Sequence, residues 1–167
     1  IGIDDGLNSF EVALLVADDF GATDSAETTL TVNNVAPTAS LSNDGPIDEG
    51  STAVVTVGSQ FDPSSVDTTT GFLYSYDFDN DGTFEVTGSA LASAVVLALY
   101  LADGPGTQTV LARIEDRDGG YSEYTTDIGI DNVAPTANAG GPYTAEENVA
   151  VALNGSGADP GTLDTLT

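Results

Sequence analysis

The chain has 167 residues, and 27 acidic residues outweigh its two basic ones, Arg113 and Arg117, which gives a formal net charge of −25. Nucleic acids and anionic lipid surfaces are bound through Lys and Arg, so this charge excludes both as partners. Cys and His are absent, which excludes disulfides, zinc sites and catalytic triads that use those residues. Hydrophobic residues still make up 40% of the chain, enough to build a core. We therefore expect a folded acidic protein whose natural partner is a cation.

Alternation of side chains with period 2 predicts strands along the whole chain. In each run, β-branched or aromatic residues fill every second position, as they do on the buried face of a strand. Clusters of Gly, Pro, Asp and Asn separate the runs, at intervals that suit the turns of a β-sandwich. In chain order, the predicted strands include the residues from Phe10 to Val16, Thr52 to Val57, Phe72 to Phe78, Val110 to Ile114 and Tyr124 to Ile130.

A repeat of 98 residues organises these strands. The run Val35-Ala36-Pro37-Thr38 recurs as Val133-Ala134-Pro135-Thr136. Upstream, the two copies align without a gap, and matched positions include Asp5-Gly6 with Asp103-Gly104, Asp18 with Asp116, Gly21 with Gly119 and Asn34 with Asn132. Downstream the alignment slips slightly, so that Asp62-Pro63 matches Asp159-Pro160 and Asp67 matches Asp164. A period of this length is typical of tandem domains of immunoglobulin size.

The repeat divides the chain into three parts. Residues 1–34 are expected to be the C-terminal part of a preceding repeat, 35–132 a complete domain, and 133–167 the N-terminal part of a following repeat. We therefore interpret the chain as a piece of a longer repeat protein. The segment from Ala92 to Leu101 could form a short helix, but we favour a buried strand because the repeat leaves no room for another layer. Helix content should be near zero.

Four motifs of the chain carry a family resemblance. The run from Tyr74 to Gly82 resembles the Trp-Asp-Phe-Gly-Asp-Gly signature of PKD (polycystic kidney disease-type) domains, with Tyr76 in place of the usual Trp. Tyr100 and the run from Pro105 to Val110 resemble its Tyr…Pro-Gly-Thr-Tyr-Thr-Val strand. Further likenesses are the Asp-x-Asp-Gly-Gly turn at 116–120 and the Ala-Pro opening at 134–140. The resemblance implies an all-β, Ig-like sandwich of about seven strands in a tandem array, within an extracellular or cell-surface protein. It implies no single activity.

The sharpest candidate site is the run Asp77-x-Asp79-x-Asp81-Gly82, followed by Glu85. Alternate carboxylates before a Gly that permits a tight turn can wrap a hard cation in oxygen ligands, and the first six positions match an EF-hand calcium loop. The twelfth position of that loop lacks its usual Glu and no helices are expected, so this is not an EF-hand. Two interpretations stay open. Either Asp77, Asp79, Asp81 and Glu85 bind calcium, or the run is a solvated hairpin turn.

A second group of candidates follows from topology, because loops after alternate strands gather at the same pole of an Ig-like sandwich. One pole should collect Asp62, Asp67, Asp116 and Asp118. The opposite pole should collect, beside the linker residues Asp131 and Asn132, the acidic residues Asp44, Asp48, Glu49, Asp77, Asp79, Asp81 and Asp103. In a tandem array two acidic poles would face each other and repel unless divalent cations lay between them. The linker also loosely resembles the calcium-binding Asp-Asn-x-Pro linker of cadherins.

The acidic residues at the two poles and in the linker can be interpreted in two ways. The first makes them calcium ligands; the candidates are Glu49, Asp62, Asp116, Asp118, Asp131 and Asn132. The second makes them residues that cap turns and keep the surface solvated. Arg113 and Arg117 are expected to pair with neighbouring acidic residues rather than to bind a ligand. The aromatic run from Phe72 to Phe78 is expected to be core rather than a sugar platform.

Together these patterns favour a non-enzymatic, extracellular structural or adhesive module that calcium makes rigid. Its expected partners are neighbouring repeats, or other copies of the chain through strand complementation. One alternative is a carbohydrate-binding accessory domain of a secreted hydrolase. Another is an acidic surface suited to high salt, where monovalent ions screen the charge. The longest apolar stretch, from Leu91 to Ala102, is too short to cross a bilayer, so we expect no membrane insertion.

Overall fold

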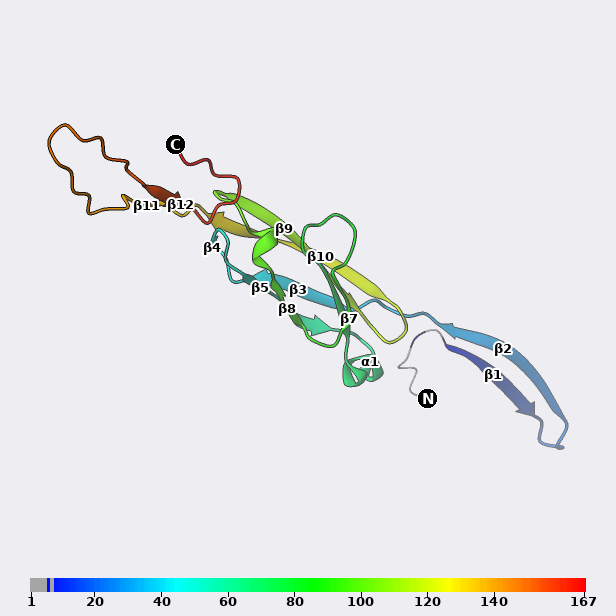
Figure 1. The fold of residues 1–167 in the computed structure, drawn as a ribbon. Coiled ribbons are helices and arrows are strands. Elements are labelled where there is room, and N and C mark those ends of the chain that lie inside the picture. The colour runs from blue at the N-terminus through cyan, green and yellow to red at the C-terminus, as the bar shows by residue number, and fades with distance from the viewer. Residues whose placement is uncertain (1–5, 7) are drawn as a thin grey trace.

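The computed structural model describes Gly6 and residues 8–167, which form an elongated, mostly β molecule (Figure 1). Asp5, which the sequence repeat matches to Asp103, lies outside the described residues. Two short helical segments in the described part are α1 (Ser65–Thr70) and the 3₁₀ turn η1 (Ala98–Tyr100). The described strands are β1 (Asn8–Ala17), β2 (Thr23–Val32), β3 (Thr38–Asn43), β4 (Ile47–Asp48), β5 (Ala53–Phe61), β6 (Leu73–Asp77), β7 (Val86–Ser89), β8 (Ser93–Val96), β9 (Gly106–Glu115), β10 (Tyr121–Asp131), β11 (Thr136–Asn138) and β12 (Ser156–Ala158).

Two sheets packed face to face form the centre of the molecule. One has the strand order β4-β10-β9-β6-β7, and the other has the order β3-β5-β8. Neighbouring strands are antiparallel except for β4 and β10, which pair in parallel through Ile47 with Ile130 and Asp48 with Asp131. The predicted all-β sandwich character is therefore confirmed, and the predicted strands at 52–57, 72–78, 110–114 and 124–130 correspond to β5, β6, β9 and β10.

The core lies between these two sheets and follows the alternation seen in the sequence. Its fully buried side chains come from every second position of the central strands, including Val55, Val110, Ala112, Ile114 and Ile128. Burial of one Val or Ile side chain stabilises the fold by about 1.5–3 kcal/mol. The predicted aromatic stripe is also core, since Tyr74, Tyr76 and Phe78 are all buried.

Tyr76 fills the centre of the core with a side chain that is partly polar. Its hydroxyl donates a hydrogen bond to the carbonyl oxygen of Leu91 over 3.1 Å, which satisfies the one polar group of the ring. Burial, and then the neighbouring Tyr74, raise the pKa of the Tyr76 hydroxyl to about 12. The tyrosine is therefore buried without leaving an unpaired donor.

Two sequence expectations about helices were wrong. The segment from Ala92 to Leu101 is not one buried strand, because β8 ends at Val96 and η1 follows it. The helix α1 was not expected. Its N-cap is Ser64, whose Oγ accepts a hydrogen bond from the backbone N–H of Asp67 over 3.2 Å. Such a cap satisfies a backbone donor that would otherwise be unpaired, so a six-residue helix can form where no 3.6-residue periodicity is visible.

The hairpin β1–β2 reproduces the hairpin β9–β10 at an interval of 98 residues. Asn8 pairs with Val32 and Ala17 with Thr23, and their counterparts 98 positions later, Gly106 with Ile130 and Glu115 with Tyr121, pair in the same register. The two hairpins differ in burial. Val12, Leu14 and Val16 are 45%, 62% and 58% exposed, whereas Val110, Ala112 and Ile114 are fully buried. The two hairpins thus share the same strand register, but among the described residues only β9–β10 is covered by an opposing sheet.

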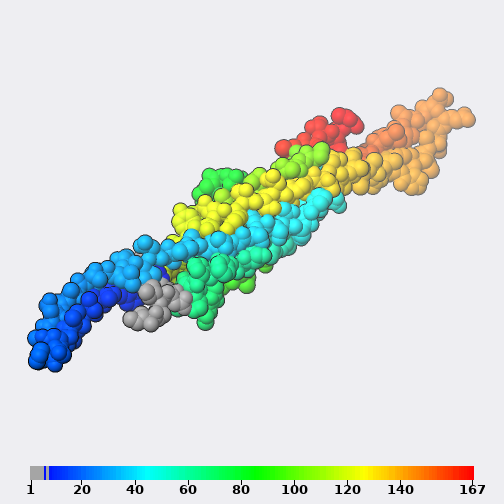
Figure 2. Space-filling model, turned by 180° about the vertical axis from the view of Figure 1, so that it is seen from behind, coloured from blue at the N-terminus to red at the C-terminus, as the bar shows by residue number. Residues whose placement is uncertain are grey.

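The two ends of the described chain extend from the sandwich in opposite directions along its long axis (Figures 1 and 2). At one end lies β1–β2, and at the other lies the short pair β11–β12. After β12 the chain turns back and touches the sandwich, where Thr162 N–H donates to the Ala102 carbonyl over 3.0 Å. Among the described residues, no helix has the length and apolar character needed to cross a membrane.

Candidate metal sites

Carboxylates gather at three places within the described part of the chain. In each group, every residue has one carboxylate oxygen that lies within 4.8 Å of the chosen oxygens of the other residues. We name these groups by their position. The buried triad is Asp62, Asp67 and Asp116; the acidic loop is Asp77, Asp79, Asp81 and Glu85; the linker cluster is Glu49, Asp159 and Asp164. They differ in burial and in what each oxygen atom already contacts.

The buried triad brings together two stretches of the chain that are distant in sequence. Asp62 follows the end of β5, Asp67 lies in α1, and Asp116 follows the end of β9. They are 4%, 0% and 3% exposed. This is the grouping that sandwich topology predicted for Asp62, Asp67 and Asp116. Asp118 was expected here too, but its carboxylate is not part of the triad; its backbone N–H donates to Asp116 Oδ1 over 2.9 Å.

Hydrogen bonds within the protein satisfy only one oxygen atom of the Asp62 carboxylate. Asp62 Oδ1 accepts from the backbone N–H of Ser64 over 2.8 Å, but Asp62 Oδ2 is buried without a hydrogen-bond partner. Leaving a buried carboxylate oxygen unpaired is costly, because it has lost its water and gained nothing in exchange. A bound cation would supply the missing contact and offset the repulsion between the three carboxylates.

Asp116 is held rigidly at the edge of the triad. Its Oδ1 accepts hydrogen bonds from the backbone N–H groups of Asp118 and Gly120 over 2.9 and 2.8 Å. Its Oδ2 accepts one from Asn34 Nδ2 over 2.9 Å, which ties the segment before β3 to the turn after β9. A Cβ added at Gly120 would lie 2.5 Å from Asp116 Oδ2 and would also collide with Asn34 Nδ2. Glycine is therefore needed here for the close approach of backbone and carboxylate.

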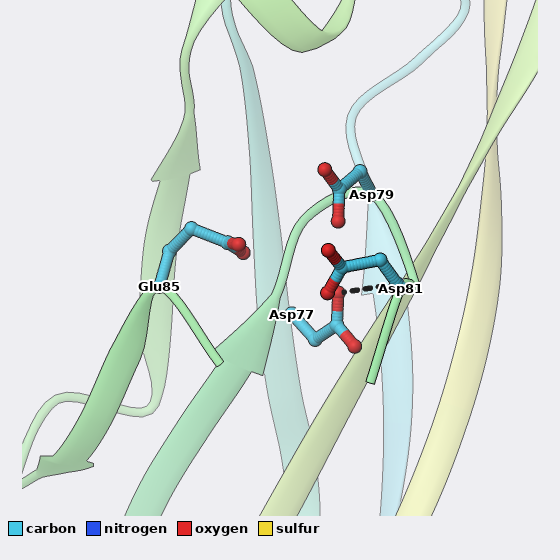
Figure 3. Close-up of side chains that lie close together, drawn as sticks. All are labelled: Asp77, Asp79, Asp81 and Glu85. Carbon is cyan, nitrogen blue, oxygen red and sulfur yellow. Dashed lines mark hydrogen bonds between the residues drawn. The ribbon is translucent and has the colours of Figure 1, made fainter. Parts of the chain in front are cut away.

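The acidic loop has a different character, because its carboxylates fold the loop itself. Figure 3 shows Asp77, Asp79, Asp81 and Glu85 around one space at the end of β6. Asp77 Oδ1 and Oδ2 accept hydrogen bonds from the backbone N–H groups of Asp81 over 3.2 Å and Gly82 over 2.9 Å. Glu85 Oε2 accepts from Phe78 N–H over 2.6 Å. Positive φ angles at Asn80 (55°) and Gly82 (93°) complete the turn, as both interpretations of the sequence required.

Apart from Asp77, the acidic residues of this loop are exposed. Partial loss of water, followed by repulsion from Asp81 and Glu85, raises the pKa of the Asp79 carboxyl above its ordinary value. Similar causes, burial first and then Glu85, raise the pKa of the Tyr100 hydroxyl. The loop is therefore a region of negative potential that would attract a cation, but no buried oxygen in it lacks a hydrogen-bond partner among the described residues.

The linker cluster joins the sandwich to the segment after β12. Glu49 is 2% exposed; its Oε2 accepts a hydrogen bond from Gly104 N–H over 2.7 Å, and its Oε1 accepts one from Val133 N–H over 2.8 Å. Loss of water, and then the charges of Asp159 and Glu49, raise the pKa of the Asp164 carboxyl. The structure thus places Glu49 at the junction, as expected, but with different companions.

The acidic residues expected at the opposite pole do not form one group. Asp77, Asp79 and Asp81 lie in the acidic loop and Glu49 lies in the linker cluster. The remaining carboxylates expected there belong to neither group within the described chain, namely Asp44, Asp48, Asp103 and Asp131. The linker residue Asn132 carries an amide and is not part of a carboxylate group. The backbone of Asp131 contributes instead, since its carbonyl accepts a hydrogen bond from Glu49 N–H over 3.0 Å. Asp159 and Asp164 were not among the predicted ligands. The signal that identifies them was their match to Asp62 and Asp67 in the repeat.

Arg113 and the aromatic stripe of β6 make contacts within the fold. Arg113 forms an ion pair with Glu123 over 2.7 Å, as predicted, and its guanidinium stacks over the rings of Phe84 and Tyr121 at 4.7 and 4.2 Å. The stripe of Tyr74, Tyr76 and Phe78 is buried, so these three rings cannot serve as a sugar platform.

Comparison with protein-family models finds no match, and comparison with curated proteins finds no significant match. The side-chain atoms that the three groups of carboxylates could offer to a metal are all carboxylate oxygens, which are ligands for hard cations such as calcium and magnesium. Of the three, the buried triad has the feature that most requires a cation, namely the unpaired Oδ2 of Asp62.

Proposed function

We propose that the chain is part of an extracellular, non-enzymatic structural or adhesive protein built from tandem Ig-like modules of PKD type, in which calcium makes the junctions rigid. The observation that carries this proposal is the buried Asp62 Oδ2, which has no hydrogen-bond partner inside a group of three buried carboxylates. A calcium ion held by Asp62, Asp67 and Asp116 would provide that partner and neutralise the group.

The tandem arrangement is supported by hydrogen bonding as well as by sequence. The registers of β1–β2 and β9–β10 coincide at an interval of 98 residues, and so do the turns. Asp18 Oδ1 accepts from the N–H groups two and four positions later over 3.0 and 2.8 Å. Asp116 Oδ1 accepts from the corresponding positions over 2.9 and 2.8 Å. One local design therefore recurs in successive modules, which favours a structural role over catalysis.

The buried triad lies where a bound cation would affect the angle between modules. Asn34, in the segment between β2 and β3, donates to Asp116 Oδ2 over 2.9 Å. A cation bound to Asp116 would fix the turn against which this segment rests. Binding to the folded state alone would also stabilise the fold. Calcium therefore rigidifies both the sandwich and the approach to it.

Neighbouring repeats are the partners that this proposal requires. The faces of β1 that carry Val12, Leu14 and Val16 are exposed, whereas their counterparts in β9 are covered. Sequence of the same kind, from a flanking repeat or from a second copy through strand addition, would cover them. Analytical ultracentrifugation over a range of concentrations distinguishes the two sources, because only strand addition between copies makes the mass depend on concentration.

Small-angle scattering tests the rigid-rod function. In calcium, the 167-residue chain is expected to show a longer and better defined maximum dimension than in EDTA, because the segments on either side of the sandwich stop bending. Matched calorimetry with calcium chloride should show binding to the same sample. Superimposable scattering profiles in calcium and in EDTA would contradict the proposal.

A further inference from the structure

An apolar groove lies on the side of the sandwich where both sheets end. The last strand of the five-stranded sheet on this side is β7, and the last strand of the three-stranded sheet is β8. Both strands and the segment around η1 line the groove, which has a volume of about 600 Å³. Its lining includes Val86 and Ser89 of β7, Ala94 and Val95 of β8, and Tyr100 of η1. We call it the edge groove.

The edge groove carries large apolar side chains that are exposed to solvent. Leu91, Val95 and Leu97 all line it and are 70%, 51% and 50% exposed. Val54, which lies opposite Val95 in the register of β5 with β8, lines it as well. Exposed apolar side chains that gather in one place mark interaction sites, whereas single ones are ordinary. A partner that covered these residues would remove their apolar surface from water, which favours association.

A strand edge runs along the same groove. Consecutive residues of β8, from Ser93 to Val95, line it, so the groove faces the edge of this strand as well as its side chains. Within the described chain β8 pairs with β5 alone, as β7 pairs with β6 alone. The outer edge of such a strand is a template for an extended peptide, which adds to the sheet through its main chain. Side chains of an added strand alternate between two faces, so every second one would enter the groove.

The acidic loop makes one wall of the edge groove negative. Glu85 lines the groove, and Figure 3 shows the other carboxylates of that loop gathered beside it. Their charge reaches the groove, because burial, and then repulsion from Glu85 and Asp79, raise the pKa of the Tyr100 hydroxyl. Neither of the two arginines of the chain is among the described residues that line the groove. Basic side chains on a ligand would therefore be attracted to this wall.

We propose that the edge groove binds an extended peptide segment of another protein, in which apolar side chains alternate with Lys or Arg. The segment adds as a strand to the outer edge of β8. Its apolar side chains cover Leu91, Val95 and Leu97, and its basic side chains lie against the acidic loop at Glu85. The groove is a different surface from the buried triad, so this partner is held without calcium.

A second copy of this chain does not have the chemistry that the edge groove requires. Each copy has a net charge of −25, so two copies repel each other. Arg113 lies in β9, where the alternating apolar side chains are buried in the core, and it pairs with Glu123. Arg117 stands between Asp116 and Asp118 with no apolar neighbour. The basic and apolar side chains must therefore come from a different protein.

Fluorescence anisotropy with the whole 167-residue chain tests the proposal. The probe is a labelled peptide of about eight residues in which Val and Lys alternate, long enough to follow an edge strand of ordinary length. The titration is made in EDTA, with circular dichroism as a check of the fold. We expect saturable binding with one peptide per chain. A peptide with Ser in place of every Val, and one with Glu in place of every Lys, should each bind at least about tenfold more weakly.

Matched variants locate the binding. Leu91→Ser should weaken it roughly tenfold, whereas Leu153→Ser, which alters a leucine of nearly equal exposure outside the groove (71% against 70%), should have no effect. Glu85→Gln keeps an oxygen atom that can accept from Phe78 N–H, and it should weaken binding roughly threefold. Glu147→Gln removes one charge from the segment between β11 and β12 and should have no effect.

Three results would overturn the proposal. Equal losses from Leu91→Ser and Leu153→Ser, or equal binding of the peptide that carries Ser, would show a general attraction to an acidic surface. Equal binding of the peptide that carries Glu would show that basic side chains are not required. Sedimentation of the chain alone tests the other occupant: a mass that rises with concentration, and no longer does so in Leu91→Ser, would assign the groove to a second copy. None of these results depends on calcium, so the proposed function is tested separately.

Discussion

The acidic loop and the buried triad are both groups of carboxylates, but they differ in burial and in how many of their oxygen atoms accept hydrogen bonds. In the acidic loop, Asp77 and Glu85 accept backbone hydrogen bonds that fold the turn, and the charges face water. In the buried triad, the chain brings Asp116 against Asp62 and Asp67, which are close together in sequence, and leaves Asp62 Oδ2 buried and unpaired. A regular Asp-x-Asp-x-Asp spacing is thus sufficient to build a turn, whereas burial without a partner is what points to a metal.

The largest expected difference between the two regions is in their response to calcium. With free calcium at about 100 times its dissociation constant, binding to the triad should stabilise the fold by roughly 2.7 kcal/mol. For a domain of this size, that corresponds to a rise in melting temperature of about 10–20 °C over the value in EDTA. Differential scanning calorimetry measures it. A rise that persists undiminished when the triad is substituted would assign the binding to the acidic loop instead.

Asp62→Asn should separate two effects of the buried charge, namely the lower stability without metal and the binding of calcium. The asparagine oxygen can still accept from Ser64 N–H, while its NH₂ group replaces the unpaired oxygen. In EDTA, we expect the melting temperature to rise by about 4–8 °C, because one of three repelling charges is gone. Calcium affinity should fall roughly 100-fold. Asp81→Asn, a matched change in the acidic loop, should leave calcium affinity within about twofold. Equal losses from both variants would contradict the distinction.

Sodium chloride should affect the exposed region more than the buried one. At 1 M salt the screening length is about 3 Å, so repulsion within the exposed acidic loop is largely removed, while the buried triad is screened little. We expect 1 M NaCl in EDTA to raise the melting temperature by less than half as much as calcium does. Melting curves in NaCl and in micromolar calcium make the comparison. Full recovery by NaCl alone would favour a surface adapted to high salt over a metal site.

The smallest effect should come from Asp79→Asn. The unfolded chain releases the Asp79 proton near its ordinary pKa of 3.8, and the folded chain releases it at higher pH. Stability is therefore greatest with the proton bound and is lost as the pH rises through the folded pKa. Removing the carboxylate should slightly raise the melting temperature at pH 7 and leave it unchanged at pH 3, where both forms are neutral. A decrease at pH 7 in EDTA would mean that Asp79 holds the turn together.

The sandwich could be predicted because successive side chains of a strand point to opposite faces of the sheet. Apolar residues at alternate positions, such as Val110, Ala112 and Ile114, therefore indicate a sheet with one buried face. It also predicted that Asp62, Asp67 and Asp116 would meet, because topology alone brings those loops together. The helix α1 was missed since six residues show no period; the pattern of Ser64 three positions before Asp67 was the available signal. The linker cluster was missed because its members belong to different repeats, and the folding back of the chain at Thr162 onto Ala102 has no local signature.

The parallel pairing of β4 with β10 also has a mechanical consequence. The segment 35–132 begins at one end of the long axis and finishes at the other (Figure 1). Tension along the chain would pull β3 and β4 one way and β10 the other. The contacts between them, including those from Asn43 Nδ2 to Thr126 Oγ1 and to the Asp127 carbonyl at 2.7 and 3.0 Å, would then be loaded in shear. Bonds loaded in shear must break together, so a module with this strand arrangement resists stretching from its ends.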